Sequence, residues 1–111
     1  MTTPSERLEK SITKDNLWLY ILTLLKDNDM YPYEIRKTIK ERFGFYPGNV
    51  TAYIVLKKLK SGGYVRIVRR MHGGGPERTY YRVTPRGLEE LDKSASSLEL
   101  LAETFSKVRK R

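Results

Sequence analysis

The stretch from Pro47 to Tyr64 most constrains how this chain of 111 residues can fold. Proline suits the first position of a helix, where its missing N–H costs nothing, and the pair Gly62-Gly63 suits the point where a helix ends. These two signals predict one helix of about four turns. One face of this helix is apolar, and the other mixes small, apolar and basic side chains. The first face holds Ala52, Leu56 and Leu59, and the second holds Val50, Thr51, Ile54, Lys57, Lys58 and Ser61.

The second face of this predicted helix is typical of a surface that reads nucleic-acid bases and phosphates. A solvated face would normally be charged throughout, whereas here small and apolar side chains stand beside two lysines. We interpret the stretch as a DNA recognition helix, although Lys57 and Lys58 alone would also fit an ordinary solvated face. Tyr53, at the edge of the apolar face, fits core packing and a phosphate contact equally well. The residues expected at DNA are Asn49, Val50, Thr51, Tyr53, Ile54, Lys57 and Lys58.

Positive charge is concentrated in one part of the chain. With 22 Lys+Arg and 13 Asp+Glu the net charge is +9, which favours a polyanionic partner such as nucleic acid or an acidic membrane surface. Nine basic residues and one acidic residue, Glu77, lie between Lys57 and Arg86, a net charge of +8 that leaves +1 for the rest. The charge therefore forms one patch.

The composition also excludes several classes of protein and site. Cysteine is absent, which rules out disulfides, thiolate metal sites and cysteine nucleophiles and suits a reducing compartment. Residues 1–16 lack the apolar core of a signal peptide, and the longest apolar run, Leu17 to Leu25, is about half a bilayer span. We therefore expect a cytoplasmic protein with no membrane partner.

Two further helices are expected before the recognition helix. The stretch from Leu17 to Asp27 is apolar almost all round, so we expect it at the centre of the core. A second helix begins at Tyr31-Pro32 and ends at Gly44. Only two residues separate Gly44 from Pro47, and two helices joined by so short a turn indicate a helix-turn-helix. The apolar face of the second helix is formed by Ile35, Ile39 and Phe43.

After Gly63 the period of the apolar residues changes to two, which is the period of a strand. Two such strands, from Val65 to Val68 and from Arg78 to Val83, are joined by a loop with Gly73-Gly74-Gly75 at its tip. A basic hairpin directly behind a recognition helix is typical of a wing. The wing residues expected at DNA are Arg69, Arg70, His72 and Arg78.

No catalytic, metal or cofactor site is expected. His72 is the only histidine, and we expect no Asp or Glu close enough to it to complete a metal site. The three glycines lack the following Lys-Ser/Thr and helix of a phosphate-binding loop. An enzyme would need a convergent acid, base or nucleophile, and the carboxylates of this chain are scattered along helix surfaces.

A long final helix is expected to begin at Thr84-Pro85, with threonine as the cap and proline at the first position. Its apolar residues recur at spacings of three and four over about two and a half heptads, which is longer than a core of this size can cover. A second copy of the chain is therefore expected along this seam. The seam consists of Leu88, Leu91, Ala95, Leu98, Leu101, Ala102 and Phe105.

The expected fold class is mainly α with a small β-hairpin (α+β), a winged helix-turn-helix followed by a long C-terminal dimerisation helix. We expect an N-terminal arm or helix at residues 1–13, the DNA-binding domain at residues 14–84 and the dimerisation helix at residues 85–111.

Three blocks of sequence carry a family resemblance: YPYEIRKTIKERF, NVTAYIVLKKLKSGGYV and GGGPERTYYRVTPRGLEEL. In this order they resemble the winged helix-turn-helix of the PadR-like transcriptional regulators, over about Leu17 to Leu91. Two positions depart from the family pattern, because Pro32 and Val50 stand where the family has glycine. Val50 lies at the N-terminus of the expected recognition helix, so we infer no sequence preference from the family. The matching positions are Tyr33, Glu34, Ile35, Thr51, Tyr53, Leu56, Leu59, Gly63, Tyr80, Tyr81, Thr84 and Gly87.

The resemblance implies a dimeric, usually repressing, transcription factor that dimerises through its C-terminal helix. It also implies a small-molecule effector, aromatic or cationic, near the dimer interface, as in many relatives. We therefore expect a sequence-specific regulator that binds palindromic double-stranded DNA as a homodimer. A winged-helix protein-interaction module or an RNA binder is the alternative.

Overall fold

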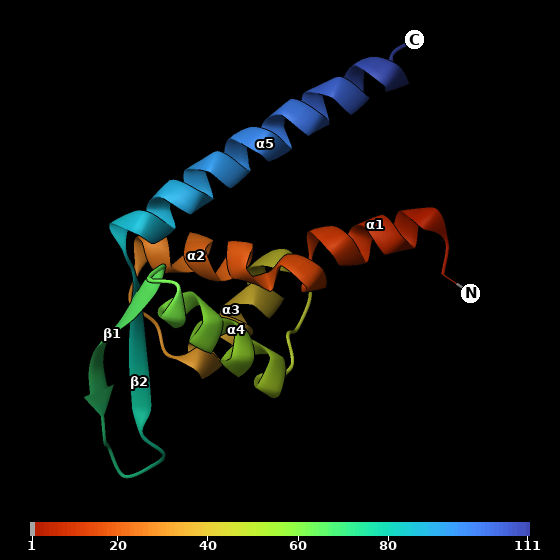
Figure 1. Ribbon diagram of the computed structural model, residues 1–111. Helices are drawn as coiled ribbons and strands as arrows, with labels where there is room; N and C mark the ends of the chain where they lie inside the picture. The colour runs from red at the N-terminus through yellow and green to blue at the C-terminus, as the bar shows by residue number, and fades with distance from the viewer. Residues whose placement is uncertain (1) are drawn as a thin grey trace.

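The computed structural model describes residues 2–111 and confirms the expected fold class, mainly α with one two-stranded hairpin (Figure 1). The elements follow the order of a winged helix-turn-helix with one helix before it and one long helix after it. In chain order they are α1 (Pro4–Ile12), a 3-10 turn (Lys14–Asn16), α2 (Leu17–Asp27), α3 (Pro32–Phe43), α4 (Asn49–Ser61), β1 (Val65–Met71), β2 (Arg78–Val83) and α5 (Pro85–Arg109).

Helix α2 lies at the centre of the core, as its all-round apolar sequence predicts. It packs against α3, α4, β2 and the first part of α5. The apolar faces expected on α3 and α4 are the faces that the core buries, with Phe43 half-buried at its edge. None of the described helices is long and apolar enough to cross a membrane. The buried residues are Leu17, Ile21, Leu22, Leu24, Leu25, Ile35, Ile39, Ala52, Leu56, Leu59, Val65 and Tyr81.

The expected start of the recognition helix at Pro47 was wrong. Helix α4 begins two positions later, at Asn49, with Gly48 as its N-cap. Pro47 is instead buried in the turn after α3, and its carbonyl accepts a hydrogen bond of 3.0 Å from Nε of Arg36. The proline therefore anchors the turn between the two helices rather than the first turn of α4.

The expected end of α4 at the glycine pair is confirmed. Gly63 has φ of +80°, a left-handed conformation that favours glycine. Its N–H bonds the carbonyl of Lys60 at 3.0 Å, and the N–H of Tyr64 bonds the carbonyl of Leu59 at 2.9 Å. This pair of bonds is a Schellman motif, which reverses the chain from α4 into β1.

The two strands form an antiparallel hairpin with an irregularity at Val68. Val65 lies opposite Val83 and Ile67 opposite Tyr81, but the register then shifts, so that Arg69 lies opposite Tyr80. Beyond this bulge β1 continues to Met71. Tyr81 and Met30 also exchange two backbone hydrogen bonds of 2.8 and 3.3 Å. The segment before α3 thus ties the hairpin to the helices.

Helix α5 begins next to the hairpin, and its C-terminal part extends away from the other elements (Figure 1). Its cap is the expected one, because Oγ1 of Thr84 accepts a hydrogen bond of 3.2 Å from the N–H of Gly87 and Pro85 occupies the first position. Its first turns pack against α2 and β2. From Leu98 onwards its apolar side chains are exposed, as are Leu8 and Ile12 of α1.

Candidate nucleic-acid interface

The outer face of α4 carries the side chains that the sequence assigns to DNA recognition. All seven are exposed, in contrast to the buried face of the same helix. Val50 and Ile54 are large apolar residues that gain nothing from facing water, and Lys57 and Lys58 follow them along the helix. Tyr53 is 59% exposed, so of its two open interpretations the structure does not support core packing. The face joins apolar contact area to positive charge.

The wing places its basic residues in two groups. Arg70 lies 3.5 Å from the carboxylate of Glu77, and Nε2 of His72 lies 3.7 Å from the same carboxylate. Arg69 and Arg78 lie over the rings of Tyr80 and Tyr31 instead. The hairpin folds Glu77 back across the tip and so brings one carboxylate beside His72 that is not adjacent to it in the sequence. No cluster of three or more metal-ligating side chains occurs among residues 2–111.

An ion pair that the sequence did not reveal holds the base of the wing. Both carboxylate oxygens of Asp29, in the segment before α3, accept hydrogen bonds from Arg82 on β2, at 2.9 and 2.8 Å. Arg69 approaches the same carboxylate at 3.7 Å. The sequence does not reveal this pair because Asp29 and Arg82 are separated by 53 residues. In the sequence, Asn28-Asp29 is an ordinary turn signal at a helix boundary.

These arginines change the acidity of Asp29. The hydrogen bonds from Arg82 hold the pKa of the Asp29 carboxyl below its usual value, although partial burial acts in the opposite direction. The positive charges of Arg82, Arg69 and Arg66 add to the lowering. The same hydrogen bonds raise the pKa of Arg82. Asp29 is therefore ionised at neutral pH and keeps Arg82 engaged.

The lowered pKa of Asp29 predicts a loss of stability in acid. A carboxyl whose pKa is lower in the folded state contributes stability that is present above its unfolded pKa and is lost as the pH falls through the folded value. We expect the wild-type melting temperature to exceed that of Asp29→Asn at neutral pH, and the difference to shrink as the pH falls below about 4. Thermal unfolding followed by circular dichroism between pH 7 and acid checks this. A difference that stays constant down to the acid limit would contradict it.

The family model for the transcriptional regulator PadR-like family matches residues 21–93. The chain belongs to the PadR-like family of transcriptional regulators. No curated protein matches it. The matched region of this PadR-like chain runs from the middle of α2 through the wing to the first turns of α5, and so includes α4 and the wing.

Solved structures of other proteins, among them transcriptional regulators, share this fold. A transcriptional regulator from Clostridium thermocellum is 26% identical with a TM-score of 0.73, over 96% of this chain and 97% of that one. A PadR family regulator from Eggerthella lenta has a TM-score of 0.80 at 23% identity, over 94% and 90%, which is a likeness in fold. Bacillus subtilis PadR, solved in complex with operator DNA, is 30% identical with a TM-score of 0.64, over 71% of this chain and 46% of that one.

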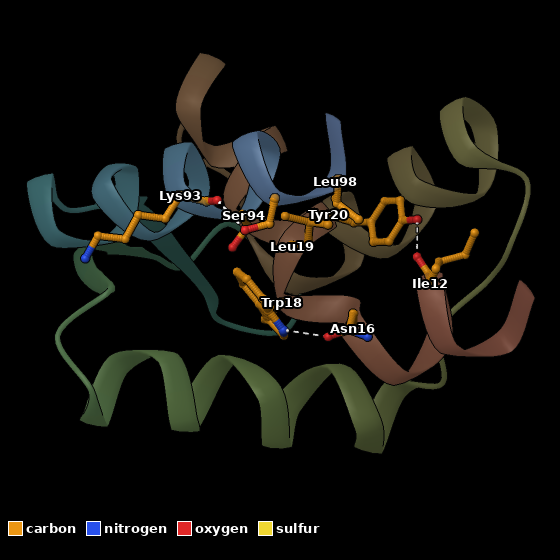
Figure 2. A pocket seen from close by; sticks show the side chains of 9 residues that line it. Ile12, Asn16, Trp18, Leu19, Tyr20, Lys93, Ser94 and Leu98 are labelled. Carbon is orange, nitrogen blue, oxygen red and sulfur yellow. Dashed lines mark hydrogen bonds between the residues drawn. The ribbon is translucent and has the colours of Figure 1, made fainter. Parts of the chain in front are cut away.

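Away from α4 and the wing, this PadR-like chain has an apolar groove of about 450 Å³ between α2 and α5 (Figure 2). Trp18, Leu19 and Tyr20 line it from α2, and Lys93, Ser94 and Leu98 line it from α5. Nε1 of Trp18 donates a hydrogen bond of 3.2 Å to Oδ1 of Asn16, which fixes the indole beside the groove. Burial raises the pKa of Tyr20, and the charge of Glu9 adds to the effect. The expected seam on α5 begins beside this groove.

Seven residues of α5 were expected to form the dimer seam, and the structure does not place them in one environment. Leu91 is half-buried against the core, whereas Leu88 at 39% is only just exposed. Leu98, Leu101 and Phe105 extend beyond the core and are 43%, 53% and 63% exposed. Ala95 and Ala102 are exposed between them. The outer half of the seam is therefore an uncovered apolar stripe.

Proposed function

We propose that this PadR-like regulator binds a palindromic DNA operator as a homodimer and represses transcription there. Helix α4 enters the major groove, and the wing lies on the phosphate backbone or in the minor groove. The observation that carries this proposal is the outer face of α4, where exposed apolar side chains stand beside lysines and next to an arginine-rich hairpin. The complex of Bacillus subtilis PadR with operator DNA supports the same use of the fold.

The proposed homodimer rests on the exposed stripe of α5. A row of exposed apolar residues on a small domain marks an interaction surface, because it would otherwise promote aggregation. Two such helices related by a two-fold axis would cover Leu98, Leu101 and Phe105 of each other. They would also hold two copies of α4 for half-sites about one helical turn of DNA apart.

The groove between α2 and α5 is the proposed site for a small-molecule effector. Its walls combine the indole of Trp18 with Leu19 and Leu98, which suits an aromatic ligand. Because α5 forms one wall and also carries the dimer stripe, a ligand there would act on the relative placement of the two recognition helices.

A titration of the protein with duplex DNA and with RNA at several salt concentrations tests the DNA-binding proposal. Phosphate-dominated binding to duplex DNA weakens steeply as salt rises. We expect Arg69→Ala, Arg70→Ala and Arg78→Ala each to weaken binding to specific and random duplexes alike and to lower the salt slope by about one unit. Tighter binding to RNA than to duplex DNA would favour an RNA binder. Binding to neither nucleic acid would favour a protein-interaction module. An unchanged slope in all three variants would remove the wing from the interface.

The specificity of the proposed complex should depend on Thr51 and Ile54. Both side chains are exposed on α4 and can contact the methyl group of thymine in the major groove. We expect Thr51→Ala and Ile54→Ala to change which sequences bind, by roughly 1–3 kcal/mol per disrupted base contact, with little change in random-duplex affinity. Selection of bound sequences from a randomised duplex pool measures this. The same selected sequences for wild type and both variants would place these side chains outside the groove.

A further inference from the structure

Three side chains of the wing and one from the segment before α3 form a layer in which two tyrosine rings contact each other and each ring carries one guanidinium group. Cζ of Arg69 lies 4.0 Å from the ring centre of Tyr80, and Cζ of Arg78 lies 4.8 Å from the ring centre of Tyr31. The two tyrosine rings meet edge to face at 5.3 Å. We call Tyr31, Arg69, Arg78 and Tyr80 the tyrosine–arginine layer.

The bulge at Val68 brings this layer together. In a regular strand Arg69 would point to the same face as Ile67, which packs on the core. The register shift instead places Arg69 opposite Tyr80, on the outer face, and Arg70 opposite Thr79, on the other face. The short segment before α3 supplies Tyr31 to the same surface. An extra residue in β1 thus decides which of two adjacent arginines is stacked.

Stacking suits these two arginines for contact with phosphate. A guanidinium over a ring face keeps its in-plane N–H donors free, and the ring restricts a long side chain that would otherwise lose entropy on binding. Arg78 has no ion pair among residues 2–111, and Arg69, which is half exposed, makes one long ion pair, with Nη1 at 3.7 Å from Oδ2 of Asp29. Arg82 differs, because Asp29 already takes two of its donors.

We propose that Tyr31 and Tyr80 are positioning residues that hold Arg78 and Arg69 for contact with DNA phosphates. This inference rests on the proposed DNA-binding function and adds two uncharged residues to it. The tyrosines contribute no charge of their own to the complex. Their effect on DNA binding passes through the arginines that they support.

Paired substitutions test the inference with a labelled DNA duplex of mixed sequence at low salt, followed by fluorescence anisotropy. Tyr31→Leu and Tyr80→Leu are each expected to weaken binding about two- to fivefold, because each removes one cation–π contact. Tyr31→Phe and Tyr80→Phe keep the ring and should bind like wild type. In the Arg78→Ala background Tyr31→Leu should cause no further loss, and Tyr80→Leu should cause none in the Arg69→Ala background.

Arg109→Ala provides a control for charge, since it removes one guanidinium at the end of α5, away from the wing (Figure 1). Circular dichroism checks whether each variant is folded. If Tyr31→Leu does not fold, the comparison of Tyr80→Leu, Arg69→Ala and their double variant decides the test. Additive losses in the double variants, or weaker binding by the phenylalanine variants, would overturn the inference. Normal binding by Arg69→Ala and Arg78→Ala would also overturn the inference, but it would leave the proposed function intact. A wild-type chain that binds no duplex would instead remove the proposed function itself.

Discussion

A chain that carries Leu98→Glu and Phe105→Glu is expected to be a folded monomer that has lost its affinity for the operator. Both side chains lie in the second half of α5 and are exposed, so charging them should leave the winged domain intact. A buried carboxylate without a partner costs several kcal/mol at an interface, which is enough to separate two chains at micromolar concentration. The monomer should retain the weak, salt-sensitive binding to random DNA that its basic patch provides.

Light scattering across a dilution series measures this loss of the dimer, and a parallel titration of specific and random duplexes measures the loss of operator affinity. Leu100→Glu with Thr104→Glu is the matched control, because it adds two charges to the opposite face of the same stretch of helix. The control should remain dimeric. A wild-type chain that stays monomeric at micromolar concentration would contradict the dimer and the palindromic operator together.

Replacing Gly87, in the first turn of α5, by alanine is expected to destabilise the protein strongly. A Cβ at this position would lie 2.2 Å from the carbonyl oxygen of Tyr64 and 2.7 Å from Cγ2 of Val83. The carbonyl cannot easily move, because it accepts a hydrogen bond of 3.0 Å from the N–H of Thr84. The first turn of α5 must therefore shift away from the hairpin. We expect a loss of about 2–3 kcal/mol in the free energy of unfolding, which lowers the melting temperature by roughly 10 °C or more.

Gly73→Ala is the matched control for this prediction. Gly73 lies at the tip of the hairpin, with a negative φ and no heavy atom within 4 Å of an added Cβ. Thermal unfolding of the two variants and the wild type should show a large shift for Gly87→Ala and almost none for Gly73→Ala. Equal melting temperatures for all three would contradict the prediction, because they would mean that α5 can shift away from β1 without loss of stability.

Those features of the fold that depend on local sequence were predictable. The apolar periods of α2, α3 and α4 predict the faces that the core buries, because the period of a helix determines which side chains lie together. The Thr84-Pro85 pair predicts the start of α5, and Gly44 and Gly62-Gly63 predict two helix ends, since caps act through the nearest backbone groups. The alternation after Gly63 predicts the hairpin for the same reason.

The features that only tertiary structure decides are contacts between distant segments. Pro47 looks like a helix start, but the burial of its ring and the bond from Arg36 make it part of the turn. The two hydrogen bonds between Arg82 and Asp29 join residues too far apart in the sequence for local patterns to predict their contact. The bulge at Val68, which reverses the faces of Arg69 and Arg70, is a feature of the pairing between β1 and β2. Local sequence therefore determined the elements of this PadR-like chain and the outer face of α4. Packing determined how the wing is attached to the segment before α3 and which of its arginines lie over tyrosine rings.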